Sequence, residues 1–202
     1  MRRTILAAAA AFAVTAILPA WAQQPQTMRV RGTIEKLDGN VLVVKSREGA
    51  DLNVTLTDNV QVVGVEKAAL SDITAGSYIG SAAMPQPDGS QKALEIHIFP
   101  ESMRGTGEGH RPYAPVPQST MTNGTVGNAV TSVEGHAVNI KYRDGEKKIV
   151  VPPDVPIVRY VIGTKADLKP GAHFTIISAT KKPDGTLETA RVNVGRDGVV
   201  PQ

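Results

Sequence analysis

Hydrophobic and polar residues alternate along several short stretches of this chain. Leu52–Leu56, Leu94–Ile98 and Val138–Tyr142 each place apolar side chains at every second position. Period-two alternation is typical of a β-strand with one buried face. Val41–Val44 is a continuous apolar run, which predicts a strand buried on both faces. The pattern therefore predicts an all-β protein of short strands.

Turn residues separate these stretches, and the acidic residues are concentrated in them. Helical patterning is confined to two short segments, 66–73 and 164–168. An acid followed by glycine supplies the side-chain cap and the positive φ of a tight hairpin. We therefore expect most such carboxylates to be structural. The acids that directly precede a glycine are Asp38, Glu48, Asp88, Glu108, Glu134, Asp144, Asp184 and Asp197.

The strand and turn pattern occurs twice, about 96 residues apart, as a duplication would produce. Each copy is long enough for five or six short strands and one helical turn, which predicts a small OB-like β-barrel. The predicted division is a barrel at 28–99, a Pro/Gly-rich linker at 100–123, a second barrel at 124–196 and a C-terminal tail at 197–202. The matching blocks are Leu37–Asn40 with Val133–His136, Lys45–Gly49 with Lys141–Gly145, and Pro87–Ser90 with Pro183–Thr186.

The first residues have the three parts of a secretory signal peptide. Arg2 and Arg3 precede an apolar stretch from Ile5 to Leu18, and Ala20 and Ala22 fit the small-residue cleavage rule. We expect residues 1–22 to be removed after Ala22. No later stretch is long and apolar enough to form a transmembrane segment. The mature chain is thus predicted to be a soluble protein of a bacterial periplasm.

Three motifs resemble those of a bacterial secreted domain family of unknown function. They are Arg31–Asn40, Asp167–Gly171 and Pro183–Val192, and the resemblance covers both copies, about 145 residues. It implies an OB-like barrel, often found in tandem behind a signal peptide. Some relatives are labelled metal ABC transporter permeases, which would need several membrane spans that this sequence lacks. No catalytic residues are established for the family, so the resemblance implies none.

Charge and composition exclude several classes of function. The chain has 22 basic and 19 acidic residues and no cysteine; without Arg2 and Arg3 the balance is 20 to 19. A nearly neutral protein with few aromatic residues gives no reason to expect nucleic acid as a partner. The absence of cysteine excludes disulfides and thiolate chemistry.

No catalytic motif is present in the sequence. It has no Gly-x-Ser-x-Gly elbow, no His-Glu-x-x-His and no P-loop, and a carboxylate in an exposed turn lacks the shielding that acid–base catalysis needs. We therefore predict a non-enzymatic protein with no catalytic residues and no cofactor.

One set of residues offers an alternative as a metal site. Glu95 and His97 lie two apart on a predicted strand and so face the same side, and Met103 and His110 follow in the predicted linker. Carboxylate, histidine and methionine are ligands for copper or zinc. Against this, the duplication matches His97 with Asn193, so no metal site is common to the two copies. The set is kept as an alternative only.

These observations support a binding or interaction module for an envelope protein or another envelope component. The alternative is a periplasmic metal-binding accessory protein that uses copper or zinc, and the third hypothesis is an enzyme of unknown class. The residues of the binding site, the partner and the oligomeric state are left open by the sequence.

Overall fold

The structure is a computed structural model that describes residues 26–132 and 135–201, so the predicted signal peptide at 1–22 lies outside the described residues. The described part is all-β, as predicted. Besides its strands it contains three single turns of 3-10 helix, η1 Leu70–Asp72, η2 Glu101–Met103 and η3 Lys165–Asp167. The strands are β1 Thr27–Asp38, β2 Val41–Ser46, β3 Asp51–Lys67, β4 Tyr78–Pro85, β5 Gln91–Ile98, β6 Gly109–Pro112, β7 Thr120–Ser132, β8 Gly135–Tyr142, β9 Gly145–Val151, β10 Ile157–Ile162, β11 His173–Lys181 and β12 Leu187–Gly195.

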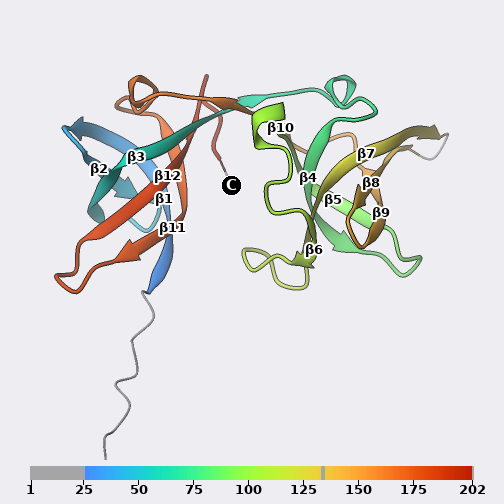
Figure 1. The fold of residues 1–202 in the computed structure, drawn as a ribbon, viewed down its shortest axis with the longest axis horizontal. Helices are drawn as coiled ribbons and strands as arrows, with labels where there is room; N and C mark the ends of the chain where they lie inside the picture. The colour runs from blue at the N-terminus through green and yellow to red at the C-terminus, as the bar shows by residue number, and fades with distance from the viewer. Residues whose placement is uncertain (1–25, 133–134, 202) are drawn as a thin grey trace, which may run out of the picture.

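The strands form two closed five-stranded barrels, seen side by side in Figure 1. In barrel A, neighbouring strands follow the order β12-β11-β1-β2-β3, and a parallel β3–β12 ladder closes the ring. In barrel B, the order is β5-β4-β7-β8-β9, and a short parallel β5–β9 ladder closes it. Closure pairs the edges that an open sheet would expose.

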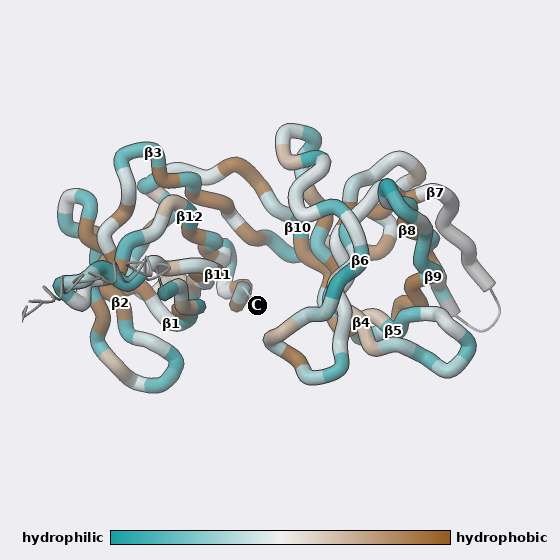
Figure 2. The backbone as a smooth tube through the Cα atoms, turned by 60° about the horizontal axis from the view of Figure 1, so that its bottom comes forward, coloured by the Kyte–Doolittle hydropathy of each residue, from teal (hydrophilic) through white to brown (hydrophobic). Residues whose placement is uncertain are grey.

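Each barrel has its own hydrophobic core, built from the inward positions of the alternating strands. Hydrophobic residues, coloured brown in Figure 2, recur along the strands of both barrels. The barrel A core contains Val30, Ile34, Leu42, Val44, Val54, Leu56, Phe174, Ile176, Val192 and Val194. The barrel B core contains Ile79, Ala93, Ile96, Val126, Val138, Ile140, Ile149 and Val151.

The predicted division into one barrel per repeat is wrong. Barrel A takes β1–β3 from the first repeat and β11–β12 from the second, while barrel B takes β4–β5 from the first and β7–β9 from the second. The predicted domains 28–99 and 124–196 are therefore intertwined by an exchange of strands. Sequence similarity defines the repeat, but it does not define which repeat each strand pairs with.

The exchange is made where β3 and β10 cross between the barrels. Gly64 pairs with Val161 and Val65 with Tyr160 in an antiparallel ladder. Residues 96 apart are equivalent in the two repeats, so Gly64 corresponds to Tyr160 and Val65 corresponds to Val161. The Gly64–Val161 pair is therefore equivalent to the Tyr160–Val65 pair. An approximate twofold axis therefore passes through the centre of this ladder and relates the two barrels.

The predicted linker at 100–123 is only partly a linker. It contains η2 and β6, and β6 pairs with β7, which itself begins at Thr120. The segment after β12 is also ordered against the protein, because Thr175 Oγ1 donates a 2.8 Å hydrogen bond to the Pro201 carbonyl. Figure 1 shows both β6 and the C-terminal end in the space between the barrels.

The predicted acid–glycine turns are confirmed in an equivalent pair. Gly89 and Gly185 have φ of 82° and 85°, a backbone conformation that glycine adopts without steric cost. Asp88 Oδ1 accepts hydrogen bonds from Ser90, and Asp184 Oδ1 accepts them from the equivalent Thr186. These hydrogen bonds lower the pKa of both aspartates. The two carboxylates are structural.

No helix in the described part of the chain is long and apolar enough to cross a membrane.

Candidate functional site

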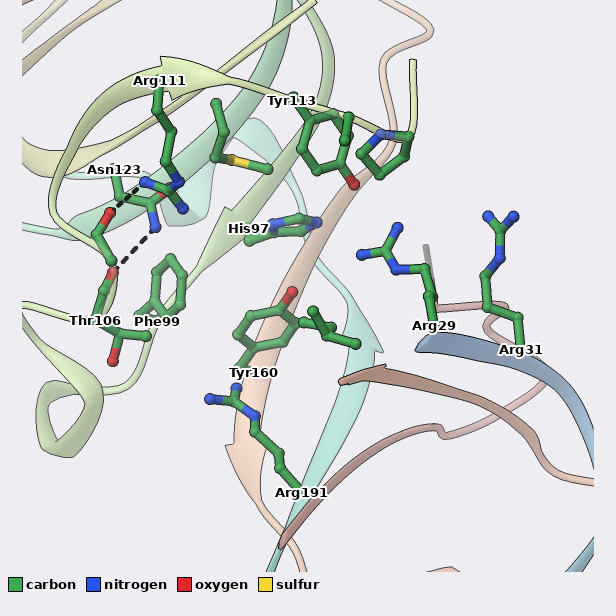
Figure 3. Close-up of a pocket in the computed structure, with 15 residues that line it drawn as sticks. Arg29, Arg31, His97, Phe99, Thr106, Arg111, Tyr113, Asn123, Tyr160 and Arg191 are labelled. Atoms are coloured by element: carbon green, nitrogen blue, oxygen red, sulfur yellow. Dashed lines mark hydrogen bonds between the residues drawn. The ribbon is translucent and has the colours of Figure 1, made fainter. Parts of the chain in front are cut away.

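A cavity of about 600 Å³ lies between the two barrels. Figure 3 shows its walls, which come from strands of both barrels and from the segment that carries β6. Three of its arginines project from barrel A, whereas its aromatic and apolar residues come mainly from barrel B and the β6 segment. The lining consists of Arg29, Arg31, His97, Phe99, Thr106, Gly107, Arg111, Tyr113, Ala114, Pro115, Met121, Asn123, Tyr160, Ile177 and Arg191.

The barrel A wall follows from strand alternation. Val30 and Val192 point into the core, so their neighbours in sequence, Arg29, Arg31 and Arg191, point outward, since successive side chains of a strand face opposite sides. The outward side at this place faces barrel B rather than solvent. Barrel A therefore presents three guanidinium groups to the cavity.

The barrel B wall depends on small residues in β4. Gly80 pairs with His97 on one side and with Asn123 on the other. A Cβ atom at Gly80 would lie 2.6 Å from Asn123 Oδ1 and 3.1 Å from Phe99 Cε2, closer than van der Waals contact. The glycine thus lets the larger side chains of β5 and β7 approach one another and form the wall.

Tyr160 lies at the centre of an aromatic cluster. Its ring stacks on His97, with 5.1 Å between the ring centroids, and meets Phe99 edge-on, also at 5.1 Å; Phe99 in turn packs edge-on against Tyr78. Burial and the nearby Glu95 carboxylate raise the pKa of Tyr160. The phenol is therefore neutral at physiological pH, and it contributes an apolar ring with one hydroxyl group.

Glu95 and His97 are paired with each other. His97 Nε2 lies 3.0 Å from Glu95 Oε1, and the side chains are only 9% and 10% exposed. The predicted placement of both on one face of a strand is confirmed. Glu95 makes this contact with His97, and no ion pair joins it to an arginine among the described residues.

The arginines of the cavity have no carboxylate partner among the described residues. Arg29 Nη1 is buried and makes no hydrogen bond within the described part of the chain. Arg191 Nε donates a 3.2 Å hydrogen bond to Asn193 Oδ1, and burial lowers the pKa of Arg191. Removing a guanidinium from water without pairing it costs free energy. Arginines elsewhere are paired, Arg104 with Glu101, Arg159 with Asp72, and Arg196 with Glu66 and Asp167.

A second unpaired polar atom lines the opposite wall. Asn123 is 5% exposed; its Nδ2 donates to the Thr106 carbonyl at 3.0 Å, but its Oδ1 has no hydrogen-bond partner among the described residues. Buried polar atoms are usually satisfied. Each wall of the cavity thus contains one buried polar atom without a partner among the described residues.

The other two candidate metal ligands, Met103 and His110, have contacts of their own. His110 Nδ1 lies 2.8 Å from Thr122 Oγ1, its ring stacks on Tyr142, and burial lowers its pKa. Met103 is the last residue of η2. No group of three or more His, Cys, Asp or Glu side chains arranged to hold a metal ion occurs in the described residues.

Sequence reasoning selected His97 but missed the arginines. Arg29-Val30-Arg31 does carry a signal, because two like charges at alternate positions of a strand must share one face. The second repeat has Met121 and Asn123 at the corresponding places, which becomes visible only when the strands are aligned by their pairing. The sequence alone does not show this correspondence, because the exchange of strands places the two sets of residues on opposite sides of one cavity.

No family model, curated protein or solved structure matches this chain in the comparisons. The resemblance to the secreted tandem-barrel family therefore stays a prediction.

Proposed function

We propose that this chain is a non-enzymatic binding protein of the bacterial periplasm that holds a component of the cell envelope in the cavity between its barrels. The cavity itself carries this proposal. Small-molecule sites typically measure about 300–1,000 Å³, and they combine apolar walls with a few polar groups. The inter-barrel cavity, of about 600 Å³, has both properties.

The absence of a catalytic motif from the sequence favours binding over catalysis. Tyr160, which lines the cavity, is held neutral. The predicted signal peptide supports the periplasmic location and hence an envelope-derived ligand.

The test uses the neutral fluorescent probe 1-anilinonaphthalene. We expect saturable binding to the mature protein. Ile177→Trp would fill the cavity from barrel A, where Ile177 is 53% exposed, and should weaken binding at least tenfold. Ile162→Trp is the matched control, because Ile162 is also an exposed strand residue but does not line the cavity.

Equal weakening by both variants would show that the probe binds elsewhere. Absence of saturable binding to the wild-type protein would contradict the proposed function. Circular dichroism and a melting curve for each variant exclude an effect of misfolding.

A further inference from the structure

We infer that the cavity selects an organic anion, a small molecule with one oxyanion group, carboxylate, sulfonate or phosphate, attached to an apolar body. This inference rests on the proposed function and specifies its ligand class. It depends on where the unpaired cations lie, on which carboxylates are already used, and on the apolar surface opposite them.

The cations converge on one region of the cavity. Figure 3 shows Arg29 extending from β1 toward His97 and Tyr160, while Arg191 approaches Tyr160 from β12. Both guanidinium groups favour the ionised form of the Tyr160 phenol, whereas burial and the Glu95 carboxylate oppose it. Two positive charges thus lie near one aromatic ring, with Arg31 beside them in the same wall.

No ion pair joins these arginines to a carboxylate among the described residues, although Glu48 is close enough to interact electrostatically with Arg31. Glu95 shares a smaller neighbouring cavity with Arg29 and Arg31, and it lies 3.0 Å from His97 Nε2. Glu108 accepts a hydrogen bond from the Arg143 amide. An oxyanion from outside would pair with guanidinium groups through the planar, two-pronged geometry that arginine offers.

The rest of the cavity fits the body of such a molecule. The lining includes Phe99, Tyr160, Met121 and Ile177, and a methionine side chain adapts to irregular shapes. Aromatic rings also attract each other in stacked or edge-on arrangements. A ligand with its anionic group toward Arg29 and Arg191 and its apolar part on the barrel B wall satisfies both sides.

The decisive experiment compares two probes that differ by one anionic group. 1-Anilinonaphthalene and 1-anilinonaphthalene-8-sulfonate share the same aromatic body. We expect the sulfonate to bind wild-type protein at least tenfold more tightly than the neutral probe. Arg29→Gln and Arg191→Gln should each reduce the ratio of sulfonate affinity to neutral-probe affinity several-fold. Arg143→Gln is the matched control, since Arg143 is exposed and lies outside the cavity.

Competition extends the test to a carboxylate. We expect 2-naphthoate to displace the sulfonate probe, and 2-naphthylmethanol to do so at least tenfold less well. Displacement by phosphatidylglycerol vesicles but not by 2-naphthoate would overturn the inference in favour of a membrane surface.

The outcomes separate this inference from the proposed function. If both probes bind with equal affinity and Ile177→Trp weakens both, the cavity binds ligands but does not select anions, and the inference is wrong. If the neutral probe does not bind at all, the proposed function fails. If the sulfonate preference is unchanged in both arginine variants, the anion is held elsewhere and the inference is also wrong.

Discussion

The two barrels present different surfaces to each other from equivalent positions. When the strands are aligned by their pairing, Ile34 with Val44 and Val126 with Ile140, β1 and β7 are equivalent with a spacing of 92 residues. Barrel A then has cations where barrel B has one apolar, one neutral polar and one acidic residue. The equivalent positions are Arg29 and Met121, and Arg31 and Asn123; on β12 and β5, Arg191 corresponds to Glu95.

The inward positions of the same strands have remained similar. Ile34 corresponds to Val126, and Val192 corresponds to Ile96; all four are buried at 2% exposure or less. Cores of similar volume preserve a fold, whereas outward positions are free to change. The barrels therefore share one architecture, while the walls that they present to the cavity differ.

A second difference concerns what fills the space next to the central ladder. Phe99 and Tyr160 pack together on the side of barrel B, while the equivalent residues, Gly195 and Gly64, leave room for the C-terminal segment. A Cβ atom at Gly195 would lie 1.7 Å from the Val199 carbonyl oxygen, and Val199 packs against Val65 and Val158. Aromatic rings form a cavity wall in one half, and the chain terminus occupies the corresponding place in the other.

The largest effect is expected from a change that tests whether both barrels are built alike. Gly32 and Gly124 hold equivalent places, and a Cβ atom would lie 1.9 Å from the Lys45 carbonyl oxygen at Gly32 and 2.2 Å from that of Lys141 at Gly124. Because backbone must move in each case, Gly32→Val and Gly124→Val should each lower the free energy of unfolding by about 3 kcal/mol. Urea denaturation measures this.

The control for these two variants is Gly39→Ala. Gly39 has a φ of 59° but no atom within 4 Å of a Cβ placed there, so only backbone strain applies, at about 1 kcal/mol. If Gly124→Val behaved like Gly39→Ala while Gly32→Val was severe, the proposed equivalence of the barrels would be contradicted.

A smaller difference in the free energy of unfolding is expected between variants of two equivalent arginine–aspartate ion pairs. Asp72 and Asp167 are equivalent; each accepts a backbone hydrogen bond at a 3-10 turn and each pairs with an arginine. Asp167 is 21% exposed and Asp72 is 38% exposed. Asp167→Asn should therefore lower the free energy of unfolding by about 1 kcal/mol at pH 7, and Asp72→Asn by less.

The stabilisation by Asp167 should depend on pH. Hydrogen bonds, first from the Thr164 amide and then from Arg196, lower the pKa of Asp167 below that of the unfolded chain. The stabilisation is then fully present above the unfolded pKa, about 3.9, and it is lost as the pH falls through the folded pKa. The difference between wild type and Asp167→Asn should stay constant from pH 7 to about pH 5 and vanish in stronger acid. A difference that grew in acid would contradict the assignment.

Much of the fold was predictable because it is encoded locally. Alternation placed the strands 52–56, 94–98 and 138–142 inside β3, β5 and β8, and the acid–glycine pairs placed hairpin turns. The exchange of strands between repeats was not predictable, since each strand has the same apolar face whether its partner comes from its own repeat or from the other.

The candidate site was predictable only in part. Strand periodicity brought Glu95 and His97 to one face, as the structure has them. The proximity of Arg29 and Arg191 could not be predicted, because they lie 162 residues apart. The β1–β11 and β11–β12 ladders bring them together. Long-range pairing, which local pattern does not specify, creates the cavity.

The smallest effect on stability is expected when Arg29 is replaced by the residue at the equivalent position of barrel B. Arg29→Met gives barrel A the residue that barrel B has at the equivalent position. Because Arg29 Nη1 is buried without a partner in the described part of the chain, the variant loses no ion pair and gains apolar contact. Replacing buried charge by an apolar residue of similar size is often neutral or stabilising. The free energy of unfolding of the ligand-free protein should therefore stay the same or rise by up to about 1 kcal/mol.

Arg196→Met is the matched control for this change. Arg196 binds Glu66 at 2.8 Å and Asp167 at 3.1 Å, so its loss leaves two carboxylates unpaired and should lower the free energy of unfolding by about 1–2 kcal/mol. Urea denaturation of both variants without organic anions compares a ligand-binding arginine with a structural one. If Arg29→Met were as destabilising as Arg196→Met, Arg29 would have an intramolecular partner and its charge would belong to the fold. If it were neutral, the unpaired charge in the barrel A wall would be a cost to the free protein that an anionic ligand removes.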